Sequence, residues 1–158
     1  MNVVVKRFIS FTNPVDVDAI LLHHHLKTAL IKHDITYVFA GDELGGLPSD
    51  RTCYDSDGKV IYEVIRKREF YKSGLDRLLK ANENKVDLAL MCSVSKPEEC
   101  HRSKLIGQEL LTHAISVNHI VSTDRFKSQE EVMNILTKGK NPINLFGEEI
   151  DLTSRKSY

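Results

Sequence analysis

Short runs of apolar residues alternate along this chain with stretches of helical spacing, and that alternation constrains its fold more than any other feature. The β-branched and apolar runs that predict strands cover residues 3–9, 36–40, 86–92 and 117–121. The apolar spacing typical of helices covers residues 16–33, 60–82, 97–114 and 128–138. Strands that alternate with helices indicate a parallel sheet. We therefore predict an α/β fold, a single domain over residues 1–158 with a mainly parallel sheet flanked by helices.

The predicted strand at residues 86–92 is apolar along most of its length, as expected of a central strand in a parallel sheet. Gly74 and an aromatic pair interrupt the long helical stretch before it, which predicts two shorter helices there. Residues 143–152 are typical of a small hairpin or edge strand, and residues 152–158 of a loose tail. Because ligands bind at the carboxyl ends of parallel strands, a site is expected in the loops after the second and third predicted strands.

The formal net charge of the chain is zero, because 22 basic residues balance 22 acidic ones. A nucleic-acid partner is therefore conceivable but is not indicated by charge. No apolar run approaches the roughly 20 residues of a membrane-spanning helix, so no membrane partner is expected. The odd number of cysteines, three, argues against a disulfide framework and predicts a cytoplasmic location.

Two of the three cysteines frame the loop after the third predicted strand. Cys92 ends that strand, and Cys100 stands early in the next predicted helix. Ser95 and Glu98 form the S-x-x-E pattern of a capping box, so Ser95 is the predicted helix cap. Cys100 would then lie near the positive end of the helix dipole, which favours the thiolate form of a cysteine.

His101, Arg102 and Ser103 follow Cys100 directly and extend the chemistry of this loop. A positive neighbour lowers the pKa of a thiol, and an adjacent histidine can transfer protons. Arg102 also presents a planar fork suited to a phosphate, sulfate or carboxylate. The segment therefore predicts a catalytic site built from Cys92, Cys100 and His101, with Arg102 and Ser103 binding an anionic substrate.

A structural interpretation of the same residues stays open. Cys100 extends an inward-facing stripe of its predicted helix, and buried free cysteines are usually inert. Arg102 could pair with Glu98, one helical turn earlier, rather than with a ligand. A metal site on Cys92, Cys100 and His101 is not predicted, because the gap between the two cysteines matches no familiar zinc spacing.

The segment Gly41-Asp42-Glu43-Leu44-Gly45-Gly46 follows the second predicted strand and is the other candidate site. Its carboxylates, on Asp42 and Glu43, could serve as a general base or bind a substrate hydroxyl, and its glycines would allow close backbone approach to a ligand. A tight turn with positive φ at the glycines is the structural alternative. The segment lacks the lysine of a phosphate-binding loop and the spacing of a dinucleotide fingerprint, so no cofactor is predicted.

Together these motifs resemble the family known as domain of unknown function 488, over roughly residues 35 to 122. The segments that carry the resemblance are C-x7-C-H-R-S at Cys92–Ser103, Tyr37-Val38-Phe39 before G-D-E-L-G-G, the helix pattern of Phe70, Gly74-Leu75 and Leu78-Leu79, and His119-Ile120. The resemblance implies an α/β fold and a site built from these motifs. It implies no particular reaction.

The amino end of the chain departs from that family. Members usually open with a T-I-G-H-S-like turn, which is absent here, and have a later strand that ends D-V-R. The run Val3–Arg7 lies about where D-V-R is expected, but without the acidic residue. Leu47 stands where an arginine often follows the glycine pair. A missing strand would leave a sheet edge for a second subunit to cover, so a homo-oligomer is one predicted partner.

The sequence leaves three functions open. The first is an enzyme that uses Cys92 or Cys100 for sulfur transfer, redox chemistry or hydrolysis. The second is a non-catalytic module that binds an anionic small molecule, a phosphate-bearing ligand or nucleic acid. The third is a degenerate, structural member of the family.

Overall fold

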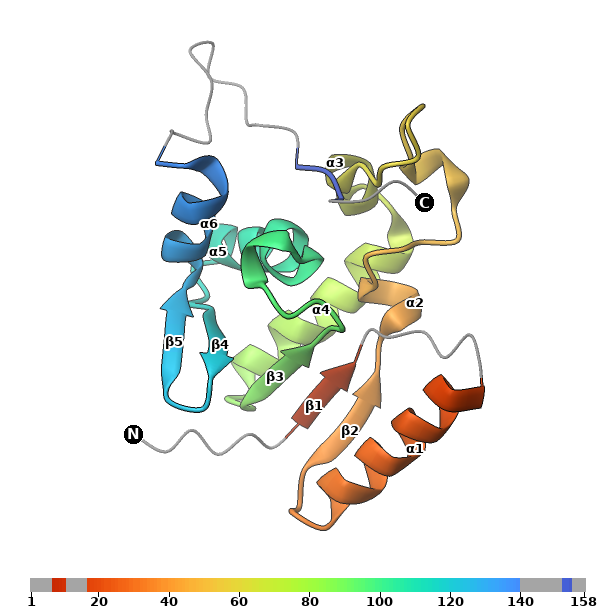
Figure 1. Cartoon of the computed structure of the whole chain (residues 1–158), viewed down its shortest axis with the longest axis vertical. Coiled ribbons are helices and arrows are strands. Elements are labelled where there is room, and N and C mark those ends of the chain that lie inside the picture. Colours follow the sequence, from red (N-terminus) through yellow and green to blue (C-terminus); the bar gives the residue numbers. More distant parts are fainter. Residues whose placement is uncertain (1–6, 11–16, 140–151, 155–158) are drawn as a thin grey trace. The chain divides into compact units, whose positions relative to one another are not determined.

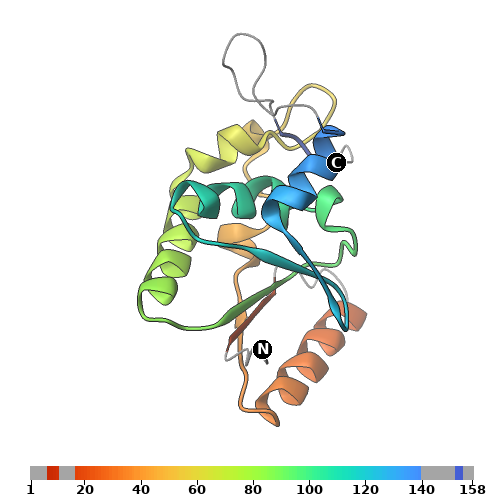
Figure 2. The ribbon, with the colours of Figure 1, turned by 90° about the vertical axis from the view of Figure 1, so that its left-hand side faces the viewer.

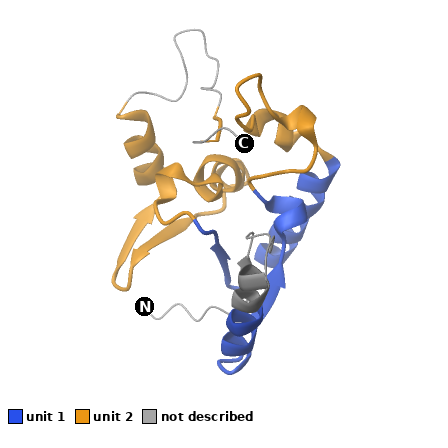
Figure 3. Cartoon of the chain, turned by 45° about the vertical axis from the view of Figure 1, so that its right-hand side comes forward, with its two compact units in different colours: residues 1–45, 69–93 blue, residues 46–68, 94–158 orange. Residues whose placement is uncertain are grey.

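The computed structural model of the chain describes residues 7–10, 17–139 and 152–154. By its internal contacts the chain divides into two compact units (Figure 3). Unit 1 comprises residues 1–45 and 69–93, and unit 2 comprises residues 46–68 and 94–158. The prediction of a single domain over residues 1–158 stays a prediction.

Unit 1 is built on a short parallel sheet. Its strands are β1 (Arg7–Ser10), β2 (Thr36–Phe39) and β3 (Leu88–Met91), paired in the order β2-β1-β3. Its helices are α1 (Val17–Ile31), α2 (Gly41–Leu44) and α4 (Glu69–Glu83). Helix α1 lies on one face of the strands and α4 on the other (Figure 2). Because the strand order is β2-β1-β3, the third predicted strand, β3, is at an edge of the sheet rather than in its centre.

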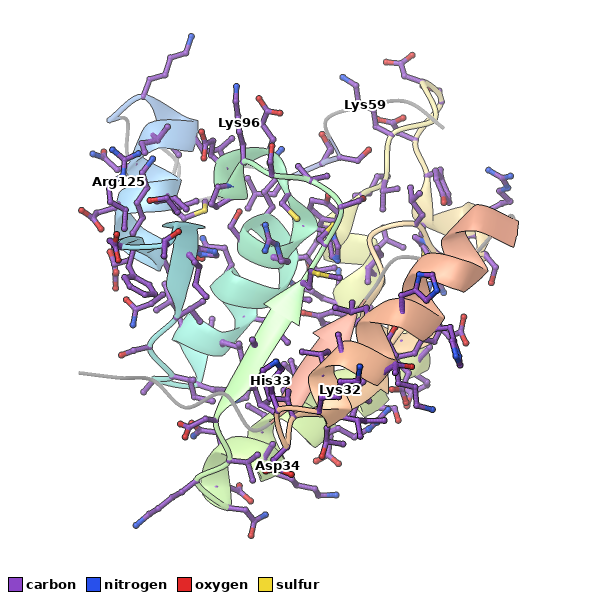
Figure 4. All side chains as sticks on the ribbon, turned by 60° about the horizontal axis from the view of Figure 1, so that its bottom comes forward. Lys32, His33, Asp34, Lys59, Lys96 and Arg125 are labelled. Carbon is purple, nitrogen blue, oxygen red and sulfur yellow. The ribbon has the colours of Figure 1, made fainter. Side chains whose placement is uncertain are left out.

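Local sequence explains the helices of unit 1. Helix α4 buries Tyr71, Gly74, Leu75 and Leu78, whose spacing places them on one helical face. Helix α1 ends in a turn at residues 32–34, whose side chains point outward in Figure 4. Asp34 has φ of 57° in that turn, a conformation that aspartate tolerates better than most residues.

Unit 2 contains short helices and one hairpin (Figure 1). Its helices are η1 (Arg51–Cys53), α3 (Tyr62–Arg66), η2 (Pro97–Glu99), the π-helix η3 (Arg102–Gly107), α5 (Gln108–Thr112) and α6 (Gln129–Thr137). Strands β4 (Asn118–Ser122) and β5 (Arg125–Ser128) form an antiparallel pair. The core of the unit includes Val60, Ile65, Leu105, Ile106 and Val132, each 0% exposed.

The predicted fold class, with a mainly parallel sheet flanked by helices, is wrong. About 50% of the described residues are helical, and the described strands form two separate small sheets rather than one. The fourth predicted strand, β4, does not join the parallel sheet but pairs with β5, which the sequence did not predict. A two-residue turn between β4 and β5 explains this, because such a short connection permits only antiparallel pairing.

The end of the chain is attached to unit 2 at residues 152–154, which the sequence assigned to a loose tail. Thr153 forms an isolated antiparallel bridge with Ile61. Ser154 is 7% exposed, and its Oγ accepts a hydrogen bond of 2.9 Å from the backbone N–H of Val60. The predicted hairpin at residues 143–152 lies, except for Leu152, outside the described residues, as do residues 155–158.

Candidate functional site

The predicted site residues are distributed over both units. Unit 1 holds Gly41, Asp42, Glu43, Gly45 and Cys92. Unit 2 holds Gly46, Cys100, His101, Arg102 and Ser103. The association of Cys92 with Cys100 therefore stays a prediction. The contacts that Cys100 makes within unit 2 are known in detail.

Cys100 is the cap of the helical run that follows it. Its backbone is extended, with φ of −102° and ψ of 147°, and its carbonyl oxygen accepts 3.2 Å hydrogen bonds from the N–H groups of Ser103 and Lys104. These are the properties of an N-cap residue. The predicted capping box at Ser95 and Glu98 is wrong, because the short η2 helix there has no side-chain cap and ends before Cys100.

Two N–H groups of Arg102 point at the sulfur of Cys100. The backbone N and the side-chain Nε of Arg102 each lie 3.4 Å from Cys100 Sγ. The thiol thus takes the place of the oxygen that a serine or aspartate cap offers to the first turn of a helix. A positive donor beside a sulfur stabilises the thiolate relative to the thiol.

The guanidinium of Arg102 makes a further contact with the protein. Its Nη2 donates a 3.0 Å hydrogen bond to the carbonyl oxygen of Val94. With Nε directed at Cys100 and Nη2 at Val94, the guanidinium is held in a fixed orientation beside the sulfur. The guanidinium of Arg102 therefore contacts the sulfur of Cys100 directly. Its predicted role in binding an anionic substrate stays a prediction.

The ring of His101 lies near the thiol of Cys100, and Gly46 packs against that ring. His101 is 6% exposed, and its Nδ1 lies 3.7 Å from Cys100 Sγ. A Cβ atom on Gly46 would come within 2.8 Å of Cγ and Nδ1 of that ring. Gly46 is thus required for the close approach of the backbone to His101. The sequence predicted an approach of the glycines to a ligand and did not predict this packing role.

Ser103 has a structural place in the same turn. It is 0% exposed, and its hydroxyl donates to the carbonyl oxygens of Pro97 and Cys100. These bonds tie the η2 helix to the start of the next helical turn. The prediction that Ser103 binds a substrate stays untested, but its hydroxyl is already engaged with two backbone acceptors.

The helix that begins after Cys100 is widened, a feature that the sequence did not predict. The N–H of Gln108 donates to the carbonyl of Ser103, the i to i+5 bond of a π-helix. The same carbonyl accepts a 2.9 Å bond from the side-chain amide of Gln129, which is 0% exposed. Gln129 thereby adds a buried side-chain hydrogen bond to the turn that follows the cysteine.

Gln129 also connects this helix to β4. Its amide nitrogen donates to Ser103 and Gln108, so its oxygen is the acceptor for Nε2–H of His119, at 2.6 Å. Burial lowers the pKa of His119, and the nearby charge of Arg102 lowers it further, while the bond to Gln129 and the carboxylate of Glu98 act in the opposite direction. His119 thus belongs to a buried polar network beside the site.

Cys53 provides a contrast within the same unit. It is 0% exposed, compared with 1% for Cys100, so the two thiols are equally buried. Burial raises the pKa of Cys53 in spite of a hydrogen bond from Arg68 that favours its thiolate. Similar burial with different charged neighbours makes Cys53 a natural internal reference for Cys100.

In unit 1 the first residues of the glycine motif form helix α2 rather than a turn. Among the described glycines, positive φ occurs only at Gly58 and Gly139, so positive φ does not explain this motif. Glu43 forms an ion pair with Arg77 of α4, whereas Asp42 is exposed. The two predicted carboxylates thus have different environments, and only Glu43 faces another element of the unit.

Cys92 follows β3 in unit 1 and is partly exposed. Its predicted role as an alternative nucleophile stays a prediction. The expectation that the chain has no disulfide framework also stays a prediction.

The chain that carries these motifs matches a known family. The family model described as "Domain of unknown function DUF488" matches residues 18–108, which is more than half of the chain. This chain belongs to the DUF488 family. The match begins at residue 18, which is compatible with a divergent amino end in this DUF488 chain.

The comparisons with curated proteins and with solved structures add nothing to the family assignment. No curated protein matches this DUF488 chain, and no solved structure does either. None of the helices in the described part of the chain has the length and apolar character that crossing a membrane requires.

Proposed function

We propose that this DUF488 protein is an enzyme that uses the thiolate of Cys100 as its nucleophile. The observation that carries the proposal is the pair of N–H groups from Arg102 directed at Cys100 Sγ, each at 3.4 Å. A thiolate, unlike a thiol, is the reactive form in covalent catalysis. The chemistry would begin with attack of this sulfur on an electrophilic atom of the substrate, as in sulfur transfer, disulfide exchange or hydrolysis.

The neighbours of the sulfur supply the other parts of such a site. His101 Nδ1, 3.7 Å from Sγ, is placed to accept the thiol proton or return it to a leaving group. The burial of Cys100 and His101 strengthens these interactions, because electrostatic effects are larger away from water. Arg102 is then a positioning residue that acts through the sulfur, and Cys92 remains the alternative nucleophile.

The proposal is tested by comparing the labelling of two equally buried thiols. The intact protein is treated with iodoacetamide at neutral pH, and peptide mass spectrometry follows the modification of Cys100 and Cys53 with time. We expect Cys100 to react about tenfold faster or more, because its thiolate is stabilised while burial raises the pKa of Cys53. Equal rates, or faster labelling of Cys53, would favour the structural interpretation of Cys100.

A further inference from the structure

A cavity of about 330 Å³ lies within unit 1, between α4 and the strands β2 and β3. Its volume falls within the range of small-molecule sites in proteins. The described apolar residues that line it include Val38, Leu44, Leu78, Val86 and Leu88, and the charged ones include Glu43, Arg77 and Lys80. The interior is thus largely apolar, with charged groups gathered from α2 and α4.

Gly74 explains how two separate motifs come to share this cavity. A Cβ atom at Gly74 would lie 2.6 Å from Cγ of Leu44 and 2.9 Å from Cβ of Glu43. The glycine therefore lets α2 pack directly against α4. As a result, Glu43 and Leu44 of the glycine motif and Gly74 and Leu78 of the α4 motif all line the same space.

The charged groups at the cavity indicate the kind of ligand. Arg77 pairs with Glu43 through Nη1, and its side chain is 53% exposed, so a ligand in the cavity can reach the guanidinium. Glu43 receives a second contact, at 3.4 Å, from the hydroxyl of Ser73. Each of the two cations at the cavity forms an ion pair, Lys80 with Asp76 and Arg77 with Glu43. An anionic group on the ligand would therefore bind the exposed guanidinium of Arg77 in place of Glu43.

We propose that this cavity binds a small amphipathic carboxylate. The apolar part of the ligand lies among Val38, Leu78 and Leu88, and its carboxylate binds the guanidinium of Arg77. Glu43 competes with the ligand for Arg77 and so limits the affinity. This proposal concerns unit 1 alone and does not depend on the chemistry proposed for Cys100.

The test uses octanoate as a carboxylate probe and 1-octanol as its neutral counterpart, with binding to the full chain followed by NMR. We expect the wild-type protein to bind octanoate more tightly than octanol. Arg77→Gln should weaken octanoate binding about tenfold and leave octanol binding unchanged, since one charge-assisted contact is lost. Glu43→Gln should act in the opposite direction on octanoate, because it releases Arg77 from its ion pair.

A third variant tests the position of the apolar part. Ala81 lines the cavity from α4, and Ala81→Phe should fill it and abolish the binding of both probes. Ala81→Leu is the smaller replacement, and circular dichroism verifies that each variant is folded. The proposal is overturned if wild-type protein binds neither probe, if both folded Ala81 variants bind as wild type does, or if Arg77→Gln weakens both probes equally.

Discussion

Replacing Arg102 by methionine is expected to slow the alkylation of Cys100 at neutral pH by about 10- to 100-fold. A positive charge within a few ångströms of an ionisable group shifts its pKa by about 1–3 units, and the reactive thiolate fraction changes tenfold for each unit. Methionine keeps the length and apolar character of the arginine stem but removes Nε, which lies 3.4 Å from Sγ. The measurement is the labelling rate of Cys100 by peptide mass spectrometry.

Two further variants separate this electrostatic effect from a loss of structure. Arg102→Lys keeps the positive charge but not the planar guanidinium, so its labelling rate should be intermediate. Ser103→Ala removes hydroxyl contacts with Pro97 and Cys100 from the same turn without changing charge. If Ser103→Ala slows labelling as much as Arg102→Met does, the arginine would have no specific effect on the thiolate.

Gly107→Ala is expected to destabilise the protein by about 2–4 kcal/mol. An added Cβ would lie 2.3 Å from Oε1 of Gln129 and 3.1 Å from the carbonyl oxygen of Arg102, a crowding that the buried π-turn cannot relieve easily. If Gln129 moves away, the carbonyl of Ser103 and Nε2 of His119 each lose a buried partner. Denaturant unfolding, followed by circular dichroism, measures the change in free energy.

The physical cause of this cost is tested by a double-mutant cycle with Gln129→Ala. In that background the oxygen that crowds position 107 is gone, so Gly107→Ala should cost clearly less than it does in the wild-type chain. An undiminished cost would show that the helix backbone, rather than the glutamine, excludes a side chain at residue 107.

Local patterns in the sequence predicted much of the secondary structure. Apolar spacing identified α1, α4 and α6. The prediction of two helices within residues 60–82 is confirmed by α3 and α4, but they divide at residues 67–68, whereas Gly74 and the aromatic pair lie within α4. In the structure α6 begins with a capping box formed by Ser128 and Glu131. These features depend on contacts between residues three or four positions apart, which a single sequence displays directly.

The arrangement of strands required information that is not local. β3 was predicted to be central because its run is apolar, yet β1 takes that position. β4 was assigned to the parallel sheet because it follows a helix, yet the short turn to β5 makes it one strand of a hairpin. Pairing is decided by tertiary packing, and neither hydrophobicity nor order along the chain determines it alone.

The candidate site was predicted in its residue types but not in its geometry. The sequence identified Cys100, His101 and Arg102 as candidate site residues, and in the structure the side chains of His101 and Arg102 lie near Cys100 Sγ in unit 2. It could not predict that Cys100 itself caps the helix, because the S-x-x-E pattern offered a cap five residues earlier. Gln129 gave no signal at all, since a glutamine beginning a capped helix is normally exposed.

The most direct test of the account is a pH titration of the Cys100 thiolate by ultraviolet absorbance, taken as the difference between the wild-type chain and Cys100→Ser. We expect the midpoint to lie below about 8.5, the pKa of an unperturbed thiol. The same difference taken with Cys53→Ser should give a midpoint above that value, because burial raises the pKa of Cys53. A Cys100 midpoint at or above about 8.5 would contradict the claim that Arg102 maintains a thiolate nucleophile at this position.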